Sequence, residues 1–179
     1  MAIRQIVTDE EFLRKTCKPV EAFNEKLWML LDDMAETMYA ANGVGLAAIQ
    51  VGVLRRVVVI DTDDELIELI NTEIIKTSGT QTGQEGCLSF PGQYGEVSRP
   101  NVVTVRAQDR YGKEFKIKGE ELLARAFCHE TDHLDGKVFV DLAKDLHFEK
   151  YYCRGKRNEY YFYGNSRFCS NVACRFNRR

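Results

Sequence analysis

The 179-residue sequence contains no apolar run close to the roughly 20 residues that a membrane-spanning helix needs. Its N-terminal segment also lacks the apolar core of a secretory signal peptide, so we expect a cytoplasmic protein that does not associate with membranes. In that reducing compartment the six cysteines are not expected to form structural disulfides. They are therefore candidates for core residues, reactive thiols or metal ligands.

Residues 1–150 contain no internal repeat and no linker-like stretch. The composition, with 44% hydrophobic and 29% charged residues, is ordinary for a globular protein, and the chain is long enough to bury a core. We predict one catalytic domain over residues 1–150. Residues 151–179 are a tail rich in tyrosine, whose aromatic residues follow neither a helical nor a strand period.

The formal net charge of −2 is unevenly divided along the chain. Residues 1–150 carry 18 basic and 26 acidic residues, whereas the tail carries seven basic residues and only Glu159 as an acidic one. An acidic body argues against nucleic acid as the catalytic substrate, so no DNA partner is expected. The basic tail is suited at most to a weak contact with a polyanion.

One long amphipathic helix is predicted in the first quarter of the chain. It begins after Asn24, a favourable N-cap, and ends at Asn42-Gly43. Its apolar stripe consists of Leu27, Leu30, Leu31, Met34 and Met38.

Strands are predicted from apolar and β-branched runs further along the chain. They cover residues 56–61, 66–75, 102–107 and 114–117, and the last two form a hairpin. Residues 78–83 are expected to be a loop, and residues 85–92 a turn-rich segment.

The strongest chemical pattern is H-E-T-D-H at residues 129–133. Two histidines four residues apart on a helix project from the same face, so His129 and His133 can reach one metal ion. Glu130 is offset enough to miss the metal and to reach a water bound to it. Apolar residues before the pattern recur at helical spacing, and Gly136 is placed to end the helix. Two histidines packed in a core are the simpler alternative.

A catalytic site of this type needs a third protein ligand and one open position for water. A histidine six residues after His133 would define one class of metallopeptidase, but that position is Phe139, which excludes the class. A downstream glutamate such as Glu149 would define another class. His147 lies in a polar stretch and is expected to be exposed on the surface.

The thiols offer a different third ligand. Cys128 precedes His129 and faces about 100° away around the helix, so it is expected in the core. Cys87 follows a glycine in a turn, where a thiolate can be exposed to a metal. From the residues alone both Glu149 and Cys87 remain candidates, and a structural zinc module with four protein ligands is the non-enzymatic alternative.

Three segments together resemble the three motifs of the peptide deformylase family. They are GVGLAAIQ at residues 43–50, EGCLS at residues 85–89 and HETDHLDG at residues 129–136, in the family's order and at its separations. The resemblance extends over about residues 1–142. It implies an α+β fold in which antiparallel sheets surround a central helix carrying the HExxH motif. It also implies an enzyme that removes the formyl group from the N-terminal formyl-methionine of newly synthesised proteins.

By this resemblance Cys87, His129 and His133 hold one divalent metal ion per chain, with water as the fourth ligand. Fe²⁺ is the expected metal, although Zn²⁺, Ni²⁺ or Co²⁺ can occupy such a site. Attack by a metal-bound hydroxide is then assisted by Glu130, which acts as general base and afterwards as general acid.

The resemblance assigns further residues to the oxyanion and to the substrate. The side-chain amide of Gln50 and the backbone N–H of Leu88 would stabilise the oxyanion. Gly43 and Gly45 would allow close approach of the substrate, which adds as a strand beside them. Ile49, together with Phe127, would lie near the methionine side chain.

The sequence departs from the family pattern in its helix and in its tail. Many members have glutamine where Cys128 stands, and because this position lies outside the ligand set we expect tuning of activity and no loss. Asp132 fits the H-E-x-D-H form and is either a partner that orients the helix or a histidine, or an exposed residue. The tail matches no family ending. By analogy with basic extensions in some relatives it suggests a weak ribosome contact, and the alternative is an unrelated extension or a frame-shifted end.

Overall fold

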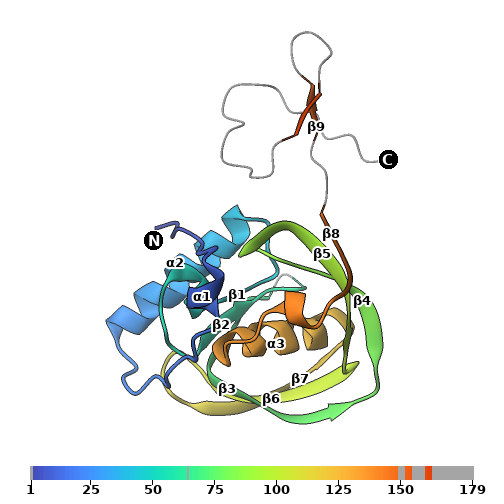
Figure 1. The fold of residues 1–179 in the computed structure, drawn as a ribbon. Coiled ribbons are helices and arrows are strands. Elements are labelled where there is room, and N and C mark those ends of the chain that lie inside the picture. The colour runs from blue at the N-terminus through green and yellow to red at the C-terminus, as the bar shows by residue number, and fades with distance from the viewer. Residues whose placement is uncertain (1, 64, 149–151, 155–159, 163–179) are drawn as a thin grey trace.

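The computed structural model describes residues 2–63, 65–148, 152–154 and 160–162 (Figure 1). These ranges contain three α-helices, which are α1 (Glu10–Leu13), α2 (Glu25–Ala40) and α3 (Glu121–Leu134). Two short 3₁₀ helices are η1 (Ala48–Val51) and η2 (Phe139–Asp141). The strands are β1 (Gly45–Ala47), β2 (Val57–Ile60), β3 (Ile67–Ser78), β4 (Gln81–Cys87), β5 (Phe90–Arg99), β6 (Val102–Gln108), β7 (Glu114–Glu120), β8 (Lys144–Phe148), β9 (Tyr152–Arg154) and β10 (Tyr160–Phe162).

All the paired strands of the sheets are antiparallel. The larger sheet has the order β1-β2-β3-β6-β7, and a second sheet has the order β4-β5-β8. The predicted combination of helices with antiparallel sheets is therefore confirmed, including the hairpin formed by β6 and β7. None of the helices in the described ranges is long and apolar enough to cross a membrane.

Helix α2 forms where the sequence predicts it. The Asn24 side chain accepts a hydrogen bond from the Lys26 N–H and caps the first turn. The predicted apolar stripe is buried and packs on β1 and β2, which lie beneath the helix in Figure 1. At the other end Asn42 has a φ of 54°, and the Gly43 N–H donates to the Met38 carbonyl, which closes the helix.

The prediction of a loop and a turn-rich segment over residues 78–92 is largely wrong. Strands β4 and β5 form a long hairpin whose pairs run from Gln81–Arg99 to Cys87–Phe90, leaving only a short turn at Leu88 and Ser89. Glycine, glutamine and threonine dominate β4, so it lacks the apolar alternation by which a strand is recognised. Pairing with β5 makes it a strand and places Cys87 at its end.

Helix α3 contacts both the β1-β2-β3-β6-β7 sheet and the β4-β5-β8 sheet. It contacts β1, β2, β3, β6 and β7 on one side. On another side the Arg125 guanidinium donates to the carbonyls of Gly83 in β4 and Val97 in β5. The helix ends at the C-cap Asp135, and Gly136 follows with a φ of 74°, as the sequence predicts.

Most of the predicted tail, residues 151–179, lies outside the described residues. Within it, only β9 and β10 are described, and they pair with each other in antiparallel fashion.

Candidate metal centre

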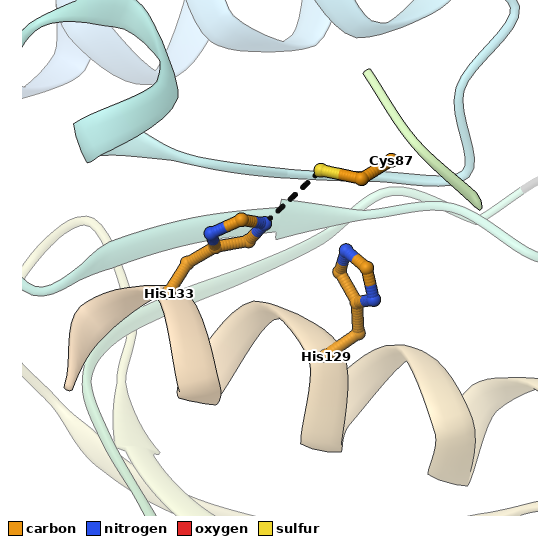
Figure 2. Close-up of side chains that lie close together, drawn as sticks. All are labelled: Cys87, His129 and His133. Carbon is orange, nitrogen blue, oxygen red and sulfur yellow. Dashed lines mark hydrogen bonds between the residues drawn. The ribbon is translucent and has the colours of Figure 1, made fainter. Parts of the chain in front are cut away.

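Three metal-ligating side chains converge between α3 and the end of β4. His129 and His133 project from one face of α3 toward Cys87 (Figure 2). Their ligand atoms all lie within 4.8 Å of one another, and Cys87 Sγ is 3.3 Å from His133 Nε2. The helical spacing supplies the two imidazoles, and the unpredicted β4–β5 hairpin supplies the thiol.

The donor set fits a divalent metal ion. Metal–sulfur and metal–nitrogen bonds of about 2.3 and 2.1 Å put tetrahedral ligand atoms roughly 3.6 Å apart, which this cluster can satisfy with little movement. His129 Nδ1 is 3.1 Å from Glu85 Oε2, so Nε2 is the nitrogen left for a metal. Among the described residues, the buried Oε2 of Glu130 has no hydrogen-bond partner, which leaves this oxygen free to bind a group at the site.

Their surroundings shift the pKa values of the two imidazoles in opposite directions. Burial by itself lowers the pKa of both rings. For His129 this effect is outweighed by hydrogen bonds to Cys87 and Glu85, which raise its pKa well above the ordinary value. For His133, burial and the positive charges of His129 and Arg99 lower the pKa well below it. His133 is therefore neutral and ready to ligate.

Glu130 lies beside the histidines on α3 and is 5% exposed. Burial raises its pKa to about 7, against the opposing effect of His129. A carboxyl group that titrates near neutrality can both accept and return a proton. Glu130 also lies directly against β1, because a Cβ atom added at Gly45 would stand 2.5 Å from its Oε1.

Gln50 is held in one orientation beside Cys87. Its Oε1 accepts a hydrogen bond of 2.8 Å from the Ala47 N–H, so its Nε2 must point the other way. Nε2 lies 3.4 Å from Cys87 Sγ and 3.2 Å from Ser89 Oγ. Leu88 follows Cys87 in the β4–β5 turn. The structure thus brings both predicted oxyanion donors to the candidate ligands, while their roles remain predictions.

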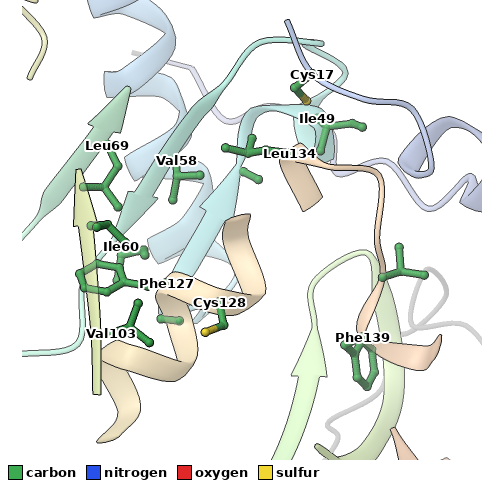
Figure 3. Packing of buried hydrophobic residues seen from close by; sticks show 14 of the residues in the cluster. Cys17, Ile49, Val58, Ile60, Leu69, Val103, Phe127, Cys128, Leu134 and Phe139 are labelled. Atoms are coloured by element: carbon green, nitrogen blue, oxygen red, sulfur yellow. The ribbon is translucent and has the colours of Figure 1, made fainter. Parts of the chain in front are cut away.

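The predicted substrate residues divide into two groups. Gly43 and Gly45 border the site, and a Cβ at Gly43 would stand 2.7 Å from the Leu88 side chain. Ile49 and Phe127 have no exposed surface and pack in the main core, Ile49 near Cys17 and Leu134 (Figure 3). The structure therefore gives no support to Ile49 or Phe127 as contacts of a methionine side chain.

Two further predictions concern residues outside the ligand set. Cys128 is buried in the core, as predicted, and burial raises the pKa of its thiol to about 11. His147 lies exposed on β8, also as predicted. The alternative ligand Glu149 lies outside the described residues.

A buried cluster of charges behind His129 was missed by the sequence analysis. Glu85 accepts hydrogen bonds from Arg99, Arg125 and His129, and Arg99 also donates to Asp132. Burial opposes ionisation of Glu85, but the hydrogen bonds from His129 and Arg99 lower its pKa to about 2. The only signal in the sequence was the place of Glu85 two residues before Cys87. Asp132 is thus bound to an arginine and is not a free surface residue.

A helix with two histidines and a buried glutamate, close to a thiol from a neighbouring strand, is the arrangement expected of a metal-dependent hydrolase. A sequence model of the polypeptide deformylase family matches residues 3–149. Peptide deformylases of Acetivibrio thermocellus and Caldicellulosiruptor bescii are 60% and 58% identical over 142 residues, which cover 79% of this chain and 84% and 86% of theirs. A peptide deformylase structure from Legionella pneumophila has a TM-score of 0.77 and 51% identity, covering 80% of this chain and 88% of that one.

The chain belongs to the polypeptide deformylase family. It is a metal-dependent hydrolase that removes the formyl group from the N-termini of newly made proteins. The resemblance seen in the three motifs is confirmed by these comparisons.

Proposed function

We propose that Cys87, His129 and His133 bind the catalytic metal ion and that Glu130 moves the proton in deformylation. The convergence of the three ligand atoms within 4.8 Å carries this proposal. The contacts of α3 with both larger sheets support its role as the central element that fixes the two histidines and Glu130.

Fe²⁺ is the metal that we propose for the site. A thiolate with two imidazoles also accepts Zn²⁺, Ni²⁺ or Co²⁺, so the donor set supports a divalent metal without selecting one. Thiolate ligation makes an iron-loaded site sensitive to oxidation, because Cys87 can be attacked as well as the metal.

A bound metal ion would supply Lewis acidity, which would lower the pKa of water and polarise the formyl oxygen. Glu130 then accepts a proton from the attacking water and delivers it to the departing amine. Its buried carboxyl group suits this exchange because its pKa of about 7 lies near the working pH. The neighbouring backbone of Gly45 confines the carboxylate at the site.

Gln50 and Leu88 would stabilise the negative charge that develops on the formyl oxygen. The fixed amide orientation of Gln50 supports this role, because the bond from the Ala47 N–H to its Oε1 keeps its Nε2 on the side of Cys87. Loss of one such donor typically raises the barrier by about 2.7–4 kcal/mol.

The substrate peptide would add beside β1. This strand is at the edge of its sheet, in the order β1-β2-β3-β6-β7, so its outer backbone groups can pair with an incoming strand. Backbone pairing suits an enzyme that acts on nascent chains of many different sequences. Gly43 and Gly45 keep this edge close to Glu130 and Leu88, and such close packing would favour a small acyl group such as formyl.

We further propose that residues 1–150 are the catalytic domain, which the family match over residues 3–149 supports. The basic tail would make a weak contact with the ribosome, and a cytoplasmic location agrees with a nascent-chain substrate. The surplus of basic residues in 151–179 is what supports the ribosome contact.

The test is formate release from a formyl-Met peptide by the metal-loaded protein, with an acetyl-Met peptide as control. We expect release from the formyl peptide alone, and Cys87→Ser should lose both bound metal and activity. A Cys87→Ser variant that keeps metal and activity would favour a metallopeptidase-like site using Glu149. Four protein ligands and no water in the metal shell would favour a structural zinc module.

A further inference from the structure

Behind the metal-binding face of α3, Glu85 receives four hydrogen bonds from charged or ionisable groups. Arg99 donates through Nε and Nη2 at 3.0 and 3.1 Å, and Arg125 donates through Nη1 at 2.7 Å. The fourth contact is the 3.1 Å bond with His129 Nδ1. Glu85, Arg99 and Arg125 are each at most 8% exposed, so water does not screen these contacts.

The contact between Glu85 and His129 fixes which nitrogen carries the proton. A carboxylate held by two guanidinium groups only accepts hydrogen bonds, so Nδ1 of His129 must donate to it. In the neutral ring that binds a metal ion, Nε2 then carries the lone pair, and the ring cannot rotate without losing the bond to Glu85. Among the described residues, Nδ1 of His133 has no such partner. A carboxylate therefore orients His129 and not His133.

Arg99 connects this carboxylate to a second acidic residue on α3. Its Nη1 donates to Asp132 Oδ2 at 2.5 Å, while its other two nitrogens hold Glu85. Asp132 lies three residues after His129 on the same helix, whereas Arg99 and Glu85 come from β5 and β4. Asp132 on α3 is thus connected to His129 on the same helix through Arg99 and Glu85, which belong to the hairpin that carries Cys87.

We propose that Glu85 is a positioning residue for His129 and that Asp132 acts through Arg99 to hold Glu85 in place. These contacts, from Asp132 through Arg99 and Glu85 to His129, form a relay that fixes the orientation of His129 in the metal-free protein. Because the ring is already oriented for binding, the relay raises the affinity for metal. The inference rests on the proposed ligand roles of Cys87, His129 and His133. A merely structural ion cluster would stabilise the fold and leave the affinity of the folded protein for metal unchanged.

The experiment measures the Zn²⁺ dissociation constant of the full-length chain by competition with a chelating dye. Glu85→Gln should weaken binding about 10- to 100-fold, the usual effect of losing the partner of a ligating histidine. Asp132→Asn should cause a smaller loss. In the double variant Asp132→Asn should add nothing, because its effect passes through Glu85.

Two variants are matched controls. Glu73→Gln removes the partner of Arg106 at an exposed position on β3, and Asp135→Asn removes the partner of Arg56 at the end of α3. Neither pair touches the relay, so the Zn²⁺ affinity should equal that of the unchanged protein. The absorption spectrum of the Co²⁺-loaded protein gives a second readout, and it should change in Glu85→Gln and not in Glu73→Gln.

Unchanged Zn²⁺ affinity in folded Glu85→Gln would overturn the proposal, and additive losses in the double variant would overturn the relay from Asp132. Glu85→Gln leaves two buried arginines without their carboxylate and can fail to fold. In that case Asp132→Asn is the test, because the Asp132 side chain is 19% exposed and its substitution disturbs the fold less. A Zn²⁺ affinity of Asp132→Asn equal to that of Asp135→Asn would then overturn the proposal. Failure of the proposed ligand set is recognised separately, since Cys87→Ser would then bind Zn²⁺ as tightly as the unchanged chain.

Discussion

At the scale of single residues, Gly45 has a steric role as well as the predicted one toward substrate. A Cβ atom at this position would stand 2.5 Å from Oε1 of Glu130 and 3.0 Å from its Cγ and Cδ. Those three atoms belong to a buried side chain that has little room to withdraw. The glycine therefore provides the space in which the Glu130 carboxylate lies.

Gly45→Ala should lower kcat/KM about 100-fold. The added methyl group would displace the Glu130 carboxylate, and a displacement of about 1 Å in an active site can cost about 100-fold in rate. The zinc content should not change, since the metal ligands lie elsewhere. Glu130→Ala, which removes the carboxylate, should cost about 10²- to 10⁴-fold with its zinc content also retained. The measurements are steady-state formate release and metal analysis of the purified variants.

Gly43→Ala is the comparison for this prediction. Its Cβ would meet a terminal methyl group of Leu88, which can turn aside, so the loss of activity should be smaller than for Gly45→Ala. Full activity of Gly45→Ala would contradict the prediction, because it would show that the Glu130 side chain can accommodate the added methyl group.

At the scale of elements, α2 stabilises the sheet edge on which the site is built. Met34 has no exposed surface and packs in the cluster that α2 forms with β1 and β2. Met29, on the same helix, is 64% exposed. The two methionines therefore allow the same substitution to be made on the buried and the exposed face of one helix.

Met34→Ala should lower the free energy of unfolding by about 2–5 kcal/mol, because it removes buried methylene groups and leaves a cavity. Met29→Ala should change it by no more than about 0.5 kcal/mol. Urea unfolding of the zinc-loaded variants measures both values. Equal effects of the two substitutions would contradict the packing of α2 described here.

At the scale of the whole molecule, Glu130 links the stability of the metal-free protein to pH. Its pKa is about 7 in the folded protein and near its ordinary value of 4.5 in the unfolded chain. Between these values the folded state binds more protons than the unfolded state, so the contribution of Glu130 to stability falls as the pH rises. Below pH 4.5 both states are protonated and the contribution is constant.

Glu130→Gln removes this titration while keeping the shape of the side chain. We expect the metal-free variant to gain stability relative to the unchanged protein as the pH rises from 4.5 to 7. Urea unfolding at several pH values measures the difference. A bound zinc ion favours the ionised carboxylate and should reduce this dependence on pH. A difference that stays constant across the window in the metal-free proteins would contradict the raised pKa of Glu130.

The sequence by itself determined the elements whose patterns are local. Residues 24–43 carry a cap, an apolar stripe and a stop in a single stretch, and residues 129–136 carry the two candidate ligand histidines, the glutamate and the stop of α3. The motif containing Cys87 was also recognised, through its resemblance to a family. Each of these signals depends on neighbouring residues of the chain.

Only the tertiary structure decided which distant residues meet. Strand β4 has no strand pattern of its own and exists because β5 pairs with it. Glu85, Arg99, Arg125 and Asp132 are ordinary charged residues in the sequence, and burial brings them together behind His129. Packing also buries Ile49 in the core, and its place near the methionine side chain stays a prediction. Burial and pairing across the chain are properties of the packed fold, and for this reason the sequence predicted the candidate ligands and not the charged residues behind them.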